Sequence, residues 1–238
     1  MSSKMKTIRR GQESYYDSLL EKHGISVDAV ASGKQIYKDL RYAKLCQLFH
    51  HDAEFSLHDV GFGLGHLYEY MKQQWPEKKI DYSGSEVTPK FVDYCLERYP
   101  DSSFQLRDLA ESVPSEQYDY LVFGGTFYHL IDSNPEDFWS YVKQMLTNAF
   151  ACAKKGIAFN LITSYVDYQL DGLFYADIHS VTDFVAKDLS RYFQIHHNYP
   201  LYEYTVLVYK EDAIAQQFPQ EEFLKYYKNT TSPIVTSN

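Results

Sequence analysis

Apolar runs alternate with segments of helical periodicity from about residue 55 onward, and this alternation predicts the core of the protein. The apolar runs predict strands at 55–60, 79–83, 103–106, 118–123 and 156–162. Helical patterns fall between them at 64–75, from Pro89 onward and at 138–153. Pro76 ends the first of these helices, and Pro89 suits the first turn of the second. Strands that alternate with helices are typical of an α/β protein with a parallel, doubly wound sheet.

The C-terminal part has a different pattern. A helix is predicted at 181–189, and two strand-like runs follow at 192–199 and 201–209, separated only by Pro200. So short a link allows no helical crossover, and we therefore expect these two strands to pair antiparallel. The predicted sheet then has about seven strands, mostly parallel, with an antiparallel C-terminal hairpin. Beyond Glu211 the chain is partly helical in pattern and then becomes polar.

The first fifty residues carry helical patterns and no strand pattern. An apolar helix face at 14–20 ends near Gly24, and helical spacing resumes up to Phe49. We predict a helical cap that packs on the following domain and contributes to a substrate pocket. Three parts are therefore expected: the cap at 1–50, the α/β core at 51–210 and a C-terminal extension at 211–238.

Composition narrows the class of protein. With 45% hydrophobic and 23% charged residues, the chain is typical of a soluble globular protein, without a predicted signal peptide or transmembrane helix. Cys46, Cys95 and Cys152 are widely spaced, so we expect buried thiols in a reducing, cytoplasmic setting rather than disulfides or metal ligands. The formal net charge of −9 argues against a nucleic-acid partner. The 23 tyrosines and 15 phenylalanines suit either a binding pocket or a homodimer interface.

The chemistry is concentrated around a glycine-rich loop. Asp59 ends the first predicted strand, and Gly61, Gly63 and Gly65 follow at alternate positions before a helical pattern begins. Glycines at this spacing let the backbone turn sharply and lie close to a ligand. The dinucleotide fingerprint G-x-G-x-x-G would place its third glycine one residue later. Because loop glycines also serve ordinary turns, the loop alone does not distinguish a turn from a nucleotide cradle.

Three further stretches follow predicted strands and should meet at the same edge of the sheet. Glu86 lies 21 residues beyond Gly65 and could accept both hydroxyls of an adenosine ribose; alternatively it stabilises a helix N-terminus. Asp108 could bind an adenine amino group, or it could be a solvated loop residue. The Gly124-Gly125 pair lets backbone and side chains approach the reacting end of a cofactor.

Taken in this order, these stretches resemble the class I S-adenosylmethionine-dependent methyltransferases. The segment 59–65 is similar to the first motif of the family, Glu86 to its ribose-binding acid and Asp108 to its adenine-contacting acid. Residues 118–122 resemble its fourth-strand motif, and the final hairpin matches its antiparallel seventh strand. The resemblance covers about residues 50 to 210 and implies a Rossmann-like fold and the cofactor S-adenosyl-L-methionine. The cofactor-binding residues that it implies are Asp59, Gly61, Phe62, Gly63, Gly65, Glu86, Val87, Asp108, Leu109, Gly124 and Gly125.

A narrower resemblance reaches the N-terminus. Segments 21–24, 39–42, 158–161 and 201–206 are similar to a little-characterised bacterial branch of the family. The branch has an arginine ahead of an aromatic residue before the first strand, and Arg41 matches it. An arginine there could clamp the methionyl carboxylate through two hydrogen bonds, although a helix-surface arginine is an equal alternative. Phe62 is a departure, since the family often has cysteine or serine at that place.

The implied reaction is an in-line transfer of a methyl group to an oxygen or nitrogen of a small-molecule acceptor. The protein mainly aligns the reacting atoms, so few catalytic groups and no metal are needed. His129, as a general base, and Tyr128 are the catalytic candidates, while packing or helix capping is the alternative for His129. The predicted walls of the substrate pocket are Tyr15, Tyr16, Tyr37, Asn160 and Tyr175.

Other functions stay open. An enzyme of the same cofactor class could catalyse a different, even intramolecular, alkylation. A non-catalytic nucleotide-binding protein or an NAD-dependent oxidoreductase could also use a similar sheet. The glycine spacing and the antiparallel hairpin count against the oxidoreductase.

Overall fold

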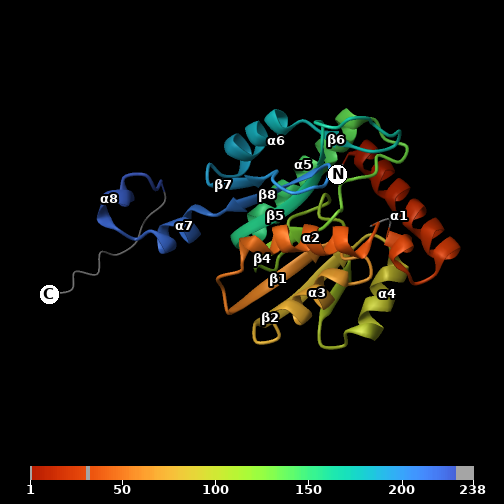
Figure 1. Cartoon of the computed structure of the whole chain (residues 1–238), viewed down its shortest axis with the longest axis horizontal. Helices are drawn as coiled ribbons and strands as arrows, with labels where there is room; N and C mark the ends of the chain where they lie inside the picture. Colours follow the sequence, from red (N-terminus) through yellow and green to blue (C-terminus); the bar gives the residue numbers. More distant parts are fainter. Residues whose placement is uncertain (1, 31–32, 229–238) are drawn as a thin grey trace.

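One mixed sheet of eight strands runs through the protein, with helices packed against it (Figure 1). A computed structural model describes residues 2–30 and 33–228. The strand order is β3-β2-β1-β4-β5-β8-β7, and β6 pairs with β5 off this path. The strands are β1 Glu54–Val60, β2 Lys79–Glu86, β3 Ser103–Leu106, β4 Tyr118–Phe123, β5 Ala153–Thr163, β6 Tyr175–Ala176, β7 Phe193–His196 and β8 Glu203–Tyr209.

The predicted fold class is confirmed. Strands β1 to β5 pair in parallel, whereas β8 runs antiparallel to β5 and β7 antiparallel to β8. The two-residue strand β6 was not predicted, because so short a run has no detectable periodicity. The hairpin is shorter than predicted: its first strand ends at His196, and residues 197–202 connect the strands around Pro200.

Helices connect the strands and cover both faces of the sheet. The helices are α1 Ser3–His23, η1 Val27–Val30, α2 Gln35–Leu45, η2 Cys46–Leu48, α3 His66–Gln74, α4 Pro89–Arg98, α5 Pro135–Cys152, α6 Ile178–Phe184, the π-helical turn η3 Val185–Leu189, α7 Glu211–Gln217 and α8 Glu221–Leu224. Helix α3 begins two residues later than predicted, since Gly65 caps it with a φ of 75°. In the described part of the chain, no helix has both the length and the apolar character needed to cross a membrane.

Two hydrophobic cores lie on opposite faces of the sheet. Along β4, Leu121 and Phe123 join the core beneath α5 and α6, while Tyr120 and Val122 join the core beneath α3 and α4. Successive side chains of a strand point to opposite faces, so a strand between two helical layers is apolar throughout. The three cysteines are buried and free, as predicted.

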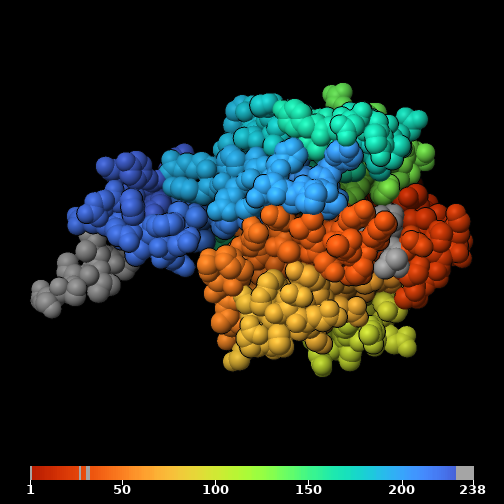
Figure 2. Space-filling model, viewed as in Figure 1, coloured from red at the N-terminus to blue at the C-terminus, as the bar shows by residue number. Residues whose placement is uncertain are grey.

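The N-terminal helices pack against the α/β core. Helix α1 contacts η1 and α5, and α2 contacts α3, β5 and β8. At the other end of the chain, α7 and α8 project from the body as an extension, drawn in blue (Figures 1 and 2). The last residues of the predicted C-terminal extension, 229–238, lie outside the described residues.

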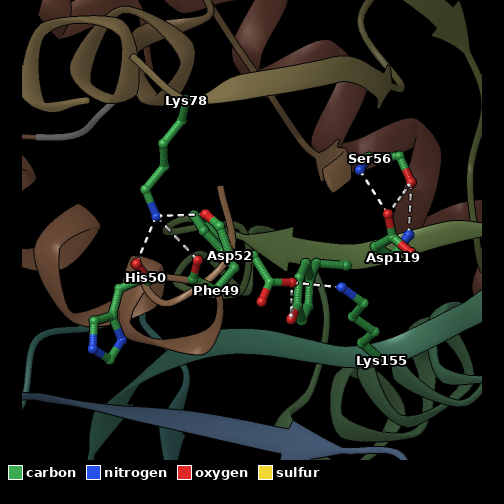
Figure 3. A network of polar contacts seen from close by, with 8 residues as sticks. Phe49, His50, Asp52, Ser56, Lys78, Asp119 and Lys155 are labelled. Carbon is green, nitrogen blue, oxygen red and sulfur yellow. Dashed lines mark hydrogen bonds and ion pairs between the residues drawn. The ribbon is translucent and has the colours of Figure 1, made fainter. Parts of the chain in front are cut away.

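A polar network fixes the amino end of the sheet, far from the glycine loop (Figure 3). The Lys78 ammonium donates hydrogen bonds to the backbone oxygens of Phe49 (3.4 Å), His50 (2.6 Å) and Asp52 (2.8 Å). The Asp52 carboxylate in turn accepts a hydrogen bond of 2.5 Å from Lys155 at the start of β5. Although burial opposes ionisation, this partner helps to keep the pKa of Asp52 below its ordinary value. The turn before β1 is therefore held to β5.

Candidate active site

A cavity of about 870 Å³, part of it open to solvent, lies where the strands β1, β2 and β4 end. The glycine loop, the end of β2 and the loop after β4 form part of its wall. Helices α1, α2, α3, α4 and α5, the turn η1 and Arg107 after β3 also contribute. Of the predicted site residues, those on the wall are Gly61, Phe62, Gly63, Glu86, Val87, Gly124, Gly125 and Tyr16.

The glycine loop has a conformation that disfavours side chains. Gly63 has a φ of 54°, and a Cβ atom there would lie 2.9 Å from Cγ1 of Val30. Gly65 has a φ of 75°, and a Cβ atom there would meet the Tyr99 ring at 2.6 Å. Gly63 lines the cavity, whereas Gly65 does not. The third glycine is therefore required by packing and by the turn into α3, and its place in the motif needs no ligand contact.

Glu86 links the end of β2 to the glycine loop. One carboxylate oxygen accepts hydrogen bonds from the backbone nitrogens of Val87 (2.7 Å) and Thr88 (3.3 Å), and the other accepts one from Gly63 (3.2 Å). Burial raises the pKa of Glu86, and these three backbone donors oppose the shift. A carboxylate has about four acceptor positions. Three of these positions are used, so Glu86 keeps about one acceptor position on the cavity wall and can take a hydroxyl donor from a ligand.

Asp59 does not face the cavity, contrary to the expectation for a cofactor-binding acid. Its side chain is buried and accepts a 2.6 Å hydrogen bond from the Tyr82 hydroxyl. Burial raises the pKa of Asp59 to about 7, against the effect of the Tyr82 hydrogen bond. The first acid of the motif thus belongs to the packing between β1 and β2.

This buried carboxyl leads to a pH-dependent prediction. Because the folded-state pKa is about 7 and the unfolded value is about 4, the folded protein binds more protons between these pH values. The free energy of unfolding should therefore fall as pH rises through that window, by about 1.4 kcal/mol for each pH unit. Asp59→Asn should remove this loss and be more stable than the wild type above pH 7. Denaturant unfolding of both proteins below pH 4 and above pH 7 measures this difference in the free energy of unfolding. Equal stability of Asp59→Asn and the wild type above pH 7 would contradict the prediction.

Asp108 and Leu109 also lie off the cavity wall. The Asp108 carboxylate accepts hydrogen bonds from the backbone nitrogen of Ala110 (2.8 Å) and the hydroxyl of Tyr141 (2.9 Å). Leu109 is fully buried in the core beneath α5. The neighbouring side chains Arg107 and Tyr141 line the cavity instead. Arg107 is therefore the residue of the third motif that lines the cavity. The Asp108 carboxylate holds the hydroxyl of Tyr141, which reaches the cavity from α5.

Arg41 forms a bidentate clamp, but the carboxylate in it belongs to the protein. Its Nε and Nη2 atoms donate to the two carboxylate oxygens of Glu203 on β8, at 2.9 and 2.6 Å. Both side chains are buried, and burial alone would lower the pKa of Arg41. The neighbouring Tyr128 and Glu203 keep that pKa above its ordinary value. This pairing differs from the predicted contact between Arg41 and the methionyl carboxylate.

Tyr128 and Asn160 complete the same buried network. The Tyr128 hydroxyl donates to Glu203 at 2.6 Å, and the Asn160 amide donates to Glu203 at 3.0 Å and to the Tyr128 oxygen. The Asn160 side-chain oxygen accepts a 2.9 Å hydrogen bond from the backbone nitrogen of Gly125. The network therefore holds the loop that carries Gly125 onto β5 and β8. None of its four side chains lines the cavity, all four lying in the described chain.

The other predicted contacts are dispersed. The His129 ring packs against the Tyr15 ring, with 5.2 Å between the ring centroids, and it lies off the cavity wall. Tyr37 is 41% exposed at the surface, and the Tyr175 hydroxyl accepts a hydrogen bond from the Leu170 backbone. Of the five predicted pocket walls, all in described segments, Tyr16 alone reaches this cavity. Aromatic content indicated a pocket but could not tell which rings face it.

Several cavity residues were missed by sequence reasoning. Gln12 on α1 lines the cavity, and its Nε2 atom donates a 2.7 Å hydrogen bond to the backbone oxygen of His129. His66, the first residue of α3, also lines the cavity. The Lys38 side chain is fully buried, and its ammonium has no hydrogen-bond partner among the described residues. Burial, followed by the charge of Lys38, lowers the pKa of His66. No motif marks these positions.

Comparisons with known proteins agree with this architecture. The chain is 31% identical over 158 residues to a protein of Mycobacterium tuberculosis whose name assigns it as a methyltransferase; the match covers 66% of this chain and 93% of that protein. No family model matches the sequence.

Solved methyltransferases share the fold. One is the 1,6-didemethyltoxoflavin-N1-methyltransferase of Burkholderia thailandensis, crystallised with its substrate and S-adenosylhomocysteine, with a TM-score of 0.62, 12% identity and coverage of 88% of this chain and 91% of that one. Another is an N-methyltransferase of Bradyrhizobium japonicum with S-adenosylhomocysteine, with a TM-score of 0.59, 12% identity and coverage of 82% and 98%. At these identities the structures establish the fold, and the mycobacterial relative establishes the family. The chain belongs to the class I S-adenosylmethionine-dependent methyltransferases.

Proposed function

We propose that this enzyme moves a methyl group from S-adenosylmethionine to an oxygen or nitrogen of a small, largely apolar molecule that binds beneath α1. The observation that carries the proposal is one continuous cavity. The glycine loop and Glu86 line it together with Gln12 and Tyr16 of α1. Cofactor and acceptor would therefore bind side by side in one enclosure, as in-line displacement requires. In this proposal residues 1–50 are the substrate cap and 51–210 the cofactor-binding core.

The cofactor half of the site is assigned from the residues on the wall. Glu86 would accept a hydrogen bond from a ribose hydroxyl, with the Gly61 and Gly63 backbone close to the ligand and Val87 beside the base. Arg107 and Tyr141 would flank the adenine in place of Asp108. When bound, the cofactor supplies an electrophilic methyl group on a sulfonium sulfur.

Lys38 replaces Arg41 as the proposed partner of the methionyl carboxylate. The Nε and Nη2 atoms of Arg41 are already engaged by Glu203. The ammonium of Lys38 is buried behind the cavity wall without a hydrogen-bond partner among the described residues. Asp39 and Glu69 are the acidic side chains that act on it, and its own charge acts on His66 at the amino end of α3. A carboxylate bound beside His66 would neutralise the Lys38 charge and would also interact favourably with the N-terminus of α3.

The acceptor half of the site is aromatic with two polar groups. Phe91 and Phe127 line it with Tyr16 and Gln12. Burial, followed by the nearby Glu86, raises the pKa of Tyr16 above its ordinary value, so the hydroxyl is neutral and can donate a hydrogen bond. The Gln12 amide nitrogen is used by His129, which leaves the amide oxygen free to accept. An apolar acceptor that carries a hydroxyl or amine group fits this arrangement.

Alignment is proposed as the main source of catalysis. Tyr128 is held by Glu203, and His129 lies behind Gln12, so neither is assigned to contact the acceptor directly. Burial lowers the pKa of His129, which keeps its ring neutral near pH 7. A general-base role for His129 would need a rearrangement of α1 or a bridging water.

The test is turnover of a metabolite mixture with S-adenosylmethionine, followed by mass spectrometry for S-adenosylhomocysteine and a methylated product. Tyr16→Phe and Gln12→Leu should lower kcat/KM by about tenfold or more, since each removes a hydrogen bond to the acceptor, while S-adenosylhomocysteine still binds. His129→Ala serves as the comparison and should change turnover less. A larger loss of kcat/KM in His129→Ala than in Tyr16→Phe would indicate that His129 is the catalytic residue.

The rival functions give different results. A different alkylation would consume S-adenosylmethionine without a methylated product. An oxidoreductase or a nucleotide-binding protein would bind NAD in calorimetry and not S-adenosylhomocysteine. A nucleic-acid acceptor is not proposed, because the net charge of −9 would repel phosphates.

A further inference from the structure

Ser85, the residue before Glu86 on β2, is a buried polar side chain on the wall of the active-site cavity. Its hydroxyl has no hydrogen-bond partner in the part of the chain that the structure describes. Its backbone oxygen, in contrast, accepts a 2.8 Å hydrogen bond from the backbone nitrogen of Gly61. A buried hydroxyl without a partner lowers the stability of the fold. On a cavity wall, such a group is a candidate contact for a ligand.

The neighbouring serine on the same face of β2 shows that the sheet can satisfy a hydroxyl. Ser83 is also buried, and it lies two residues before Ser85. Its hydroxyl is hydrogen-bonded to Nδ1 of His58 at 2.8 Å and to the backbone oxygen of Leu57 at 3.3 Å. Ser83 does not line the cavity, whereas Ser85 does. Of these two hydroxyls, the one without a partner is therefore the one on the cavity wall.

Ser85 and Glu86 point to opposite faces of the sheet, as successive residues of a strand do. Ser85 is in register with Val60 of β1, which belongs to the core beneath α5. On this side, α5 presents Phe138, Tyr141 and Met145 to the cavity, at the spacing of one helix face. We call this part of the cavity the α5 lobe; its residues are Val60, Ser85, Phe138, Tyr141 and Met145.

The α5 lobe is apolar except for two hydroxyls. The hydroxyl of Tyr141 already donates to Asp108 at 2.9 Å. Among these five residues, all of which the structure describes, Ser85 therefore has the one polar side chain without a partner. Aromatic and thioether side chains pack well against a flat ring. The lobe thus suits a flat heterocycle whose edge forms a hydrogen bond with Ser85.

Adenine is the heterocycle that this position favours. It is attached to the ribose, so it must lie next to the hydroxyl group that Glu86 is proposed to bind. The acceptor is proposed to lie on the other side, where Tyr16 packs on Phe91, with 6.3 Å between the ring centroids. Phe91 belongs to the core on the opposite face of the sheet from the α5 lobe.

The acid that the family resemblance assigns to adenine does not reach the cavity. The Asp108 carboxylate accepts hydrogen bonds from the Ala110 backbone and from Tyr141, and it lies off the cavity wall. The edge of the base therefore needs a different partner. We propose, on the basis of the function proposed above, that Ser85 recognises the adenine of S-adenosylmethionine through a hydrogen bond from its hydroxyl to the edge of the base. A hydroxyl can donate to a ring nitrogen or accept from the 6-amino group.

Calorimetry with S-adenosylhomocysteine and base-modified analogues tests this contact. Ser85→Ala should raise the dissociation constant of S-adenosylhomocysteine by about 3- to 10-fold, the effect of one neutral hydrogen bond. The 1-deaza, 3-deaza, 7-deaza and 6-oxo analogues each alter one part of the adenine edge. For one analogue the wild type should bind more weakly, and Ser85→Ala should add no further loss, because the contact is already absent. An equal loss with all ligands, or no loss with any, would overturn the proposal.

Ser83→Ala is the matched control, since it removes a buried hydroxyl from the same face of β2 without altering the cavity wall. It should leave the relative affinities of the analogues unchanged. Without ligand, Ser85→Ala should be at least as stable as the wild type in denaturant unfolding, because no hydrogen bond is lost. Ser83→Ala should be less stable, because His58 and the Leu57 backbone each lose a partner.

A loss of stability in ligand-free Ser85→Ala would show that its hydroxyl serves the fold, and would also overturn the proposal. Failure of the proposed function gives a different result. A wild type that does not bind S-adenosylhomocysteine would remove both that function and the role of Ser85. A wild type that binds it, with the same analogue preferences in Ser85→Ala, would remove the role of Ser85 alone.

Discussion

Glu203→Gln is expected to lower the free energy of unfolding by about 3–5 kcal/mol, because it leaves a buried guanidinium without its counter-charge. Arg41 is 5% exposed and donates two hydrogen bonds to this carboxylate. Tyr128 and Asn160 donate to it as well, so one neutral amide would have to replace a carboxylate that accepts four hydrogen bonds. Denaturant unfolding, with the change in midpoint and an unchanged slope, measures the loss.

Glu54→Gln is the matched control. Its partner Lys79 is 3.7 Å away and both side chains are at least 75% exposed, so this change should cost under about 1 kcal/mol. If Glu203→Gln is no more damaging than Glu54→Gln, the buried pair does not support the fold. Arg41→Met combined with Glu203→Leu should be less unstable than either single change, because no unpaired charge remains.

The Glu203 variant also tests the link to the active site. Asn160 connects this network to the Gly125 backbone, and Gly125 lines the cavity. A variant that is still folded should therefore bind S-adenosylhomocysteine more weakly. If the folded variant binds S-adenosylhomocysteine with unchanged affinity, the network supports the stability of the fold and does not influence the active site.

Glu86→Ala is expected to weaken binding of S-adenosylhomocysteine by about 1–3 kcal/mol, or roughly 10- to 100-fold in the dissociation constant. The change would remove the proposed acceptor of a ribose hydroxyl. It would also release the Gly63 backbone nitrogen, which Glu86 holds at 3.2 Å, and so loosen the glycine loop. Isothermal calorimetry with S-adenosylhomocysteine measures the effect.

Two further variants separate these contributions. Glu86→Gln keeps an acceptor oxygen for the loop but removes the charge, so its affinity should lie between those of Glu86→Ala and the wild type. Glu97→Ala, an exposed acid on α4, controls for the change in net charge and should bind normally. Wild-type affinity in Glu86→Ala would remove Glu86 from the ribose role.

The sequence predicted the order and type of the elements well, because each depends on local periodicity. Apolar runs flanked by helices specified β1 to β5, and the short link around Pro200 specified the antiparallel end. Errors were confined to the ends of elements and to β6, where two residues carry no pattern.

Site residues were predicted less evenly. Of the glycine positions, Gly61, Gly63, Gly124 and Gly125 line the cavity, since a loop that follows a parallel strand must end at that edge. Acidic residues near the same edge could not be sorted by sequence. Glu86 faces the cavity, whereas Asp59 faces Tyr82, because Asp59 pairs with Gly84 and therefore lies two residues deeper in the sheet than Glu86.

The sequence by itself determined the methyltransferase fold class and the position of its glycine loop, because the succession of elements along the chain and the loop glycines are local features. Only the tertiary structure decided the partners of the charged groups. Arg41 and Glu203 are 162 residues apart and meet because β8 returns beside β5, next to α2. The fold likewise decided that Gln12 and Tyr16 line the cavity while Tyr128 does not. Such long-range pairings follow from how elements pack, and no local pattern records them.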